Sequence, residues 1–229
     1  MLLNVIVFVV TLSTKNLRQH PYLILVSFLA IGDTTAGIYL TVVASVYQAM
    51  SLVEFETKRK DYCDYITFLV IFADVMIMDI SLLLTIERYL ATVFWSRPNV
   101  RMKMKHVLPV LLQSILAGLA LSIWGLLDGD LNVGGFAGYV CYPIPDLKNP
   151  QYRVYTIITV AAAILIQVAT VAMYLHIFFV ARNSGRQVGI AREAKLAKKM
   201  GTLVLTNVIF HFLPFVFFVV VIATGSFAG

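Results

Sequence analysis

Glu87 and Arg88 place a carboxylate and a guanidinium side by side after a long apolar run, in the stretch LLLTIERYLATVFW that covers residues 82–95. Charge-assisted contacts between such groups are strong, and they open when another group competes for one of the partners. The pair therefore has the chemistry of a switch. A simpler interpretation also stays open, in which Arg88 reaches from apolar surroundings to water and anchors the end of a helix.

Three more acids, Asp33, Asp74 and Asp79, lie inside apolar runs. A carboxylate in such surroundings is expensive, so each of the three is a functional hypothesis. Asp74 and Asp79 are separated by about 140° around a helix, which excludes a paired catalytic site. We expect Asp74 to face a ligand cavity. For Asp33, the alternative to a functional role is a structural one, in which hydrogen bonds inside the protein keep the carboxyl group neutral.

Catalytic and metal-binding patterns do not occur in the sequence. The four histidines lie on separate segments without metal-ligand spacing, and there is no Ser-His-Asp order and no phosphate-binding glycine loop. The histidines are His20, His106, His176 and His211. We therefore expect neither an enzyme nor a metal site.

The composition explains where these charges lie. The chain is 60% hydrophobic and 13% charged, and its mean hydropathy is +0.86, which is outside the range of soluble globular domains. A helix needs about 20 apolar residues to cross a bilayer. Apolar runs cover Met1–Leu12, Tyr22–Met50, Tyr62–Val93, Val107–Leu127, Val154–Ala181 and Leu196–Thr224. The sequence predicts an all-α bundle of membrane helices, with residues 1–229 as a single domain.

The basic residues indicate the orientation, because Lys and Arg are retained in short cytoplasmic loops. Most of the 18 basic residues follow the first, third and fifth runs. They are Lys15, Arg18, Arg97, Arg101, Lys103, Lys105, Arg182, Arg186, Arg192, Lys195, Lys198 and Lys199. These connections are therefore predicted to be cytoplasmic. Glu87 and Arg88 then lie at the cytoplasmic end of the third run.

Both cysteines of the chain fall on the external side of this topology. Cys63 lies at the start of the third run, and Cys141 lies in the loop before the fifth run. The external face is oxidising, so a disulfide between them is plausible. Two unrelated thiols are the alternative.

Five motifs follow one another in an order, and lie on sides of the membrane, that together are specific for one family of membrane proteins. They are Asn4, LAIGD at residues 29–33, the cysteines Cys63 and Cys141, ERY at residues 87–89, and Pro214. On these residues the chain resembles the rhodopsin-like (class A) G-protein-coupled receptors. The resemblance implies seven transmembrane helices, a Cys63–Cys141 bridge, and location in the cell membrane as a multi-pass protein.

Other stretches resemble one subfamily of these receptors. FFVARNS at 178–184, AKLAKKM at 194–200, YVCYP at 139–143 and IFAD at 71–74 are similar to the leucine-rich-repeat receptors for glycoprotein hormones and relaxins. The fifth run also lacks a proline, as in those receptors. The resemblance implies an extracellular ligand of the peptide or protein hormone class. A leucine-rich-repeat domain does not occur in this sequence.

The resemblance assigns roles to particular residues. The activation switch would comprise Glu87, Arg88, Tyr89, Glu193 and Pro214. A heterotrimeric G protein would contact Arg88, Lys195, Lys198 and Lys199. The intramembrane polar pocket would comprise Asn4, Asp33 and Asp74. In the family this pocket holds a sodium ion, but Ile77 takes the place of the serine that helps to line it, so we expect no cofactor.

Several positions depart from the family pattern. The tryptophan of the fourth helix is missing, since Trp124 lies near the external end and Ile115 is closer to the expected place. Before Pro214 the aromatic residue is Phe212, and the proline comes one residue later than expected. The seventh helix does not occur in the sequence. We expect the chain to be a fragment that does not signal by itself.

Two other classes of protein are alternatives to a receptor. A secondary transporter or ion channel would use Asp33, Asp74 and Asp79 as an ion path, but it would also show inverted repeats or broken spans, and the sequence shows neither. Nucleic-acid binding is disfavoured, because no basic stripe is interleaved with stacking aromatic residues. The net charge of +6 instead indicates attraction to anionic membrane lipid.

Overall fold

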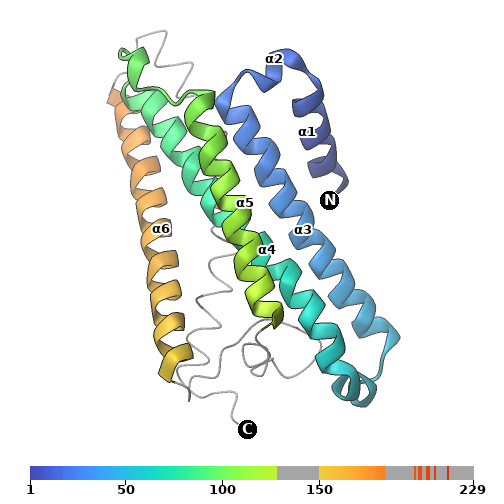
Figure 1. Ribbon diagram of the computed structural model, residues 1–229. Helices are drawn as coiled ribbons and strands as arrows, with labels where there is room; N and C mark the ends of the chain where they lie inside the picture. The colour runs from blue at the N-terminus through green and yellow to red at the C-terminus, as the bar shows by residue number, and fades with distance from the viewer. Residues whose placement is uncertain are drawn as a thin grey trace. The chain divides into compact units, whose positions relative to one another are not determined.

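The computed structural model describes residues 1–127 and 150–183, together with residues 199, 201, 202, 205, 206, 209 and 216. The elements of this part are helical and include no strand, which confirms the all-α class (Figure 1). They are α1 (Leu2–Ser13), α2 (Lys15–Arg18), α3 (Pro21–Ala49), α4 (Leu52–Val93), the 3-10 turn η1 (Pro98–Val100), α5 (Met104–Leu127) and α6 (Pro150–Asn183).

The chain divides into two compact units. Unit 1 comprises Met1–Ile80 and Lys103–Ala163, and unit 2 comprises Ser81–Met102 and Ile164–Gly229. Two of the three boundaries fall inside α4 and α6, so each of these helices contributes to both units, and the third lies just before α5. The single domain expected from the sequence stays a prediction.

In unit 1, α1 packs along α3, and α2 connects their ends (Figure 1). The rings of Phe8 and Phe28 meet edge to face with centroids 6.1 Å apart. Pro21 is the first residue of α3, where its fixed φ suits the helix and its missing N–H costs nothing. The predicted runs Met1–Leu12 and Tyr22–Met50 agree with α1 and α3 to within one residue at each end.

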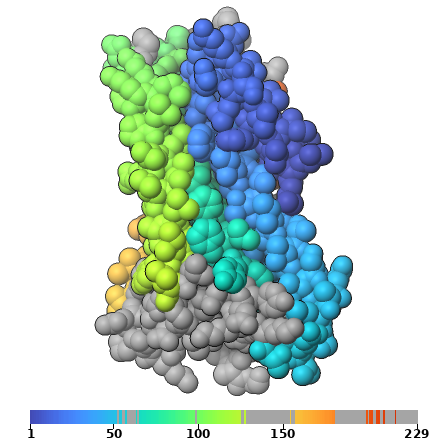
Figure 2. All heavy atoms as spheres, turned by 45° about the vertical axis from the view of Figure 1, so that its right-hand side comes forward, coloured from blue at the N-terminus to red at the C-terminus, as the bar shows by residue number. Residues whose placement is uncertain are grey.

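Small residues allow α3 and α5 to approach α4 closely. A Cβ at Gly32 of α3 would lie 2.8 Å from Ile77 Cγ1, which leaves no room for it, and a Cβ at Gly118 of α5 would lie 3.2 Å from the Phe72 ring. Membrane helices commonly associate through small residues, because lipid provides no hydrophobic force between them. Figure 2 shows part of α4 between α3 and α5.

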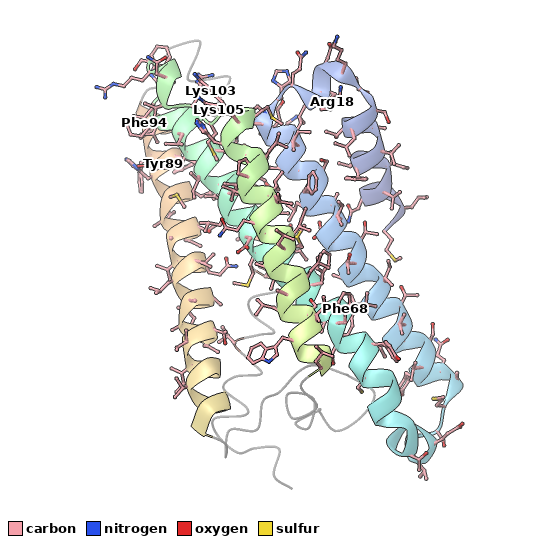
Figure 3. All side chains as sticks on the ribbon, in the orientation of Figure 1. Arg18, Phe68, Tyr89, Phe94, Lys103 and Lys105 are labelled. Carbon is pink, nitrogen blue, oxygen red and sulfur yellow. The ribbon has the colours of Figure 1, made fainter. Side chains whose placement is uncertain are left out.

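The two ends of unit 1 differ in their residues, with basic side chains at one end and a cysteine at the other, as the predicted orientation requires. Arg18, Lys103 and Lys105 lie at one end (Figure 3) and are exposed. Cys63 lies at the other end, where it is buried with Tyr39 in a cluster that includes residues from the last turns of α3. The basic end is therefore the predicted cytoplasmic end.

The membrane-crossing part of α4, Tyr65–Val93, agrees with the predicted run Tyr62–Val93, but the helix itself extends further toward the N-terminus. The helix begins at Leu52 and not at Tyr62, and it is 42 residues long, or about 63 Å. The backbone N–H of Glu54 donates to Ser51 Oγ at 3.3 Å, and the two residues have the spacing of a capping box. The charges of residues 52–61 indicated a loop, but Glu, Lys and Arg are good helix formers, and no Gly or Pro interrupts them.

Four helical segments of the described part are long and apolar enough to cross a membrane. They are Pro21–Ala49, Tyr65–Val93, Met104–Trp124 and Ile157–Val180, and Leu2–Ser13 is a shorter apolar helix. α5 and α6 begin three and four residues before the predicted starts. Most of the sixth predicted run, Leu196–Thr224, lies outside the described residues.

Candidate switch site at the end of α4

The last turns of α4 carry the site. From Tyr65 to Val93 the helix contains neither Gly nor Pro, so nothing breaks it before the polar segment that follows. The backbone N–H of Phe94 still donates to the Leu90 carbonyl at 3.2 Å, and η1 begins at Pro98. Glu87 and Arg88 therefore lie within regular helix, about one and a half turns before its end.

Glu87 and Arg88 form a buried fork. Arg88 Nε donates to Glu87 Oε2, and a terminal guanidinium nitrogen of Arg88 donates to Glu87 Oε1. The residues are 6% and 3% exposed, respectively. Neighbours in a helix do not normally face each other, so both side chains turn to reach this contact. Loss of either partner would leave a buried charge without compensation, which is strongly destabilising.

Tyr174 of α6 brings a third polar group to this fork. Its hydroxyl is buried, lies near the Thr85 hydroxyl, and is within electrostatic range of Arg88 and Glu87. Thr85 Oγ1 donates to the Ser81 carbonyl at 2.7 Å. Within the described residues the Tyr174 hydroxyl has no well-formed hydrogen bond. A hydroxyl with unused hydrogen-bonding capacity thus lies beside the buried ion pair.

Thr92 adds a second such hydroxyl one turn after Arg88. Thr92 is fully buried, and its Oγ1 has no hydrogen-bond partner among the residues that the structure describes. Buried hydroxyls are usually hydrogen-bonded, so this one has capacity for a further partner. The surroundings of Arg88 therefore contain more hydrogen-bonding capacity than the fork uses.

Tyr89 makes a different contact with α6. Its hydroxyl and His176 Nδ1 are 2.9 Å apart, and the ring centroids are 5.5 Å apart. The ring of Phe94 meets Tyr89 edge to face at 6.3 Å, at the same end of α4 (Figure 3). Tyr89 is half-buried and His176 is exposed. The end of α4 is thus bonded to α6 through an exposed polar contact as well.

Gly201, in the sixth predicted run, packs on the ring of Tyr174. A Cβ at this position would lie 3.3 Å from Tyr174 Cδ1, which is tighter than ordinary contact. The glycine allows this segment to approach α6 where Tyr174 approaches Arg88. One tyrosine therefore connects α4, α6 and the helical residues around Gly201.

Comparison with known proteins decides the family. The sequence model of the family described as 7 transmembrane receptor (rhodopsin family) matches residues 3–227. The chain belongs to this receptor family. It is accordingly a multi-pass membrane protein, and its family is one of receptors and not of enzymes.

The receptor is similar to several glycoprotein hormone receptors. It is 23% identical to the follicle-stimulating hormone receptor of Notamacropus eugenii and to the lutropin-choriogonadotropic hormone receptor of Bos taurus, each over 213 residues. It is 24% identical to the thyrotropin receptor of Felis catus over 210 residues. The matches cover 89% of this chain but only 29%, 29% and 26% of those proteins. The chain thus spans less than a third of their length.

The predicted bridge is described at one end only. Cys63 of the receptor is disulfide-bonded and 7% exposed. Cys141 lies outside the described residues, so its pairing with Cys63 stays a prediction.

The three residues of the predicted polar pocket lie on three helices. Asn4 lies on α1, Asp33 on α3 and Asp74 on α4, and all three are half-buried. Ile77 of α4 is 1% exposed and packs against Gly32, the neighbour of Asp33 in the sequence. A buried aliphatic side chain therefore occupies position 77, and its correspondence with the family's serine stays a prediction.

Asp74 and Asp79 face different helices, as their angular separation predicts. Asp74 is within electrostatic range of the Tyr39 hydroxyl on α3. Asp79 is hydrogen-bonded to the Ser114 hydroxyl on α5. The two carboxyl groups therefore do not form a catalytic pair.

The structure describes only part of the predicted cytoplasmic set. Lys199 is described and exposed. Glu193, Pro214, Lys195 and Lys198 lie outside the described residues, so their roles stay predictions.

Sequence reasoning did not identify Tyr174 as a site residue and treated His176 as an isolated histidine. Both are polar residues in the last turns of an apolar run that leads into a basic loop. Tyr174 and His176 precede their basic loop with a spacing like that of Glu87 and Arg88 before the loop that follows them. This similar spacing was the sign in the sequence that the four residues could share a site.

Proposed function

We propose that this chain is the signal-transducing part of a G-protein-coupled receptor, in which Arg88 is the residue that a heterotrimeric G protein meets at the cytoplasmic end. The buried Glu87–Arg88 fork carries the proposal. A buried ion pair often contributes little to stability relative to apolar packing. Its presence near the membrane surface is better explained by a pair that must open.

The residues around Glu87 and Arg88 provide the alternative partners that Arg88 needs when the ion pair opens. In the resting state Glu87 holds Arg88, and Glu193, just before the sixth run, is a further predicted partner. On activation the sixth run moves outward, and Arg88 exchanges Glu87 for the G protein and for the Tyr174 hydroxyl, which has capacity for a further hydrogen bond. Lys195, Lys198 and Lys199 would then flank the bound G protein. A shift of about 1.4 kcal/mol between the two states changes their ratio tenfold.

The proposed ligand is an extracellular protein hormone of the glycoprotein hormone class. The support is the similarity to follicle-stimulating hormone, lutropin-choriogonadotropic hormone and thyrotropin receptors, together with the subfamily stretches in the sequence. Asp74, within range of Tyr39 in the outer half of unit 1, would respond to a ligand-induced change there.

Reconstitution tests this function. The full-length receptor in nanodiscs would be mixed with purified G proteins, and nucleotide exchange would be measured with and without glycoprotein hormones. Exchange that a hormone accelerates supports both the receptor function and the ligand class. Exchange that occurs but responds to no such hormone contradicts the ligand class. Absence of exchange with every G-protein class contradicts the proposed function.

A further inference from the structure

The Tyr89–His176 contact is not accounted for by the Glu87–Arg88 fork. The hydroxyl and Nδ1 are 2.9 Å apart, and the rings are tilted by 43°. His176 is exposed, so the bond lies on the outer flank of the α4–α6 contact. A hydrogen bond fixes the distance and direction between two side chains more narrowly than apolar packing does. A polar contact at this place therefore suggests a directional role.

The spacing of Tyr174 and His176 on α6 indicates that role. Two residues correspond to about 200° around a helix, so these side chains leave α6 on opposite flanks. Tyr174 reaches the buried side, near Thr85 and Arg88, and His176 reaches Tyr89. Residues of α6 thus contact the end of α4 on both flanks. A rotation of α6 that carried the Tyr174 hydroxyl toward Arg88 would also displace His176 from Tyr89.

We propose that Tyr89 and His176 are positioning residues whose hydrogen bond fixes the rotation of α6 in the resting receptor. The bond is formed while Arg88 is held by Glu87, so it stabilises the arrangement with the closed pair. It acts on Arg88 only indirectly, through the position of Tyr174. This inference rests on the proposed receptor function and adds a second restraint to the same site.

A double-mutant cycle in the full-length receptor tests the inference. Tyr89→Phe and His176→Phe each remove the hydrogen bond and keep a ring. Each should raise basal nucleotide exchange, at equal surface density, by a factor of about two to ten, which is the range expected for one net hydrogen bond. Because both variants remove the same bond, the double variant should show no further rise.

Two more variants separate the hydrogen bond from packing. His176→Asn keeps an amide near the position of Nδ1 and should return basal exchange to the wild-type level. Phe179→Leu changes an exposed ring on the same turns of α6 and should have no effect.

The positioning role would be overturned if Tyr89→Phe and His176→Phe left basal nucleotide exchange unchanged, or if their effects added in the double variant. It would also be overturned if His176→Asn raised basal exchange as much as His176→Phe. These outcomes do not depend on Arg88. The proposed function fails by a different result, namely normal G-protein coupling by an Arg88→Ala variant.

Discussion

Arg88 donates two hydrogen bonds to Glu87, the residue immediately before it on α4, and both side chains are buried. Residues adjacent in a helix point about 100° apart, so this contact is not a consequence of helix geometry. Both side chains must turn toward each other to form it. On the proposed mechanism, the functional state of the receptor depends on what competes for the guanidinium.

Glu87→Gln should raise basal signalling. Glutamine keeps the volume and one acceptor but loses the charge, and hydrogen bonds to an ionised group are about twice as strong as neutral ones. We expect basal nucleotide exchange to increase about tenfold, from a loss of about 1.4 kcal/mol in the resting state. Surface density, measured with an external tag, is the control. An unchanged basal rate at normal density would show that Glu87 does not restrain Arg88.

Tyr174→Phe should lower hormone-stimulated signalling and leave basal signalling close to normal. The ring that packs on Gly201 is kept, while the hydroxyl available to Arg88 in the active state is lost. We expect maximal nucleotide exchange to fall by about tenfold or more, since one hydrogen bond to a charged group contributes about 1.5–3 kcal/mol. A variant with a normal maximal response would remove Tyr174 from the mechanism.

Gly201→Ala should favour the active state. The added Cβ would lie 3.3 Å from the Tyr174 ring, so the sixth run must shift away from α6, which is the direction expected on activation. Basal signalling should rise severalfold. Gly118→Ala adds a comparable contact, 3.2 Å from Phe72, in unit 1. It should lower thermal stability without raising basal signalling, and equal basal effects of both variants would contradict the account.

The helices themselves could be predicted from the sequence, because apolar length determines which segments can cross a bilayer. The early start of α4 was missed because the charges of residues 52–61 outweighed the Ser51–Glu54 capping signal. The Glu87–Arg88 pair was found because it is local in the sequence. The bond between Tyr89 and His176 joins residues 87 positions apart and depends on the rotation of α6. No local pattern encodes that rotation.

Hormone binding and signalling should be insensitive to sodium ions. Ile77 fills the buried position against Gly32 where a hydroxyl would help to hold the ion beside Asp33. Agonist affinity measured in sodium chloride and in a matched organic-cation chloride should therefore agree. Ile77→Ser should introduce sodium sensitivity. A wild-type affinity that falls in sodium but not in the organic cation would show that Asp33 binds the ion without this hydroxyl.

The coupling of an Arg88→Ala variant tests the central claim most directly. The full-length receptor and the variant would be expressed at equal surface density, and hormone binding and nucleotide exchange on the G protein would be measured on the same membranes. Arg88 lies at the predicted cytoplasmic end, so the account predicts hormone affinity within about twofold of wild type, together with loss of at least about 90% of stimulated exchange, a deficit of about 1.4 kcal/mol or more. Normal exchange by Arg88→Ala would contradict the account, because Arg88 would then only anchor the end of α4.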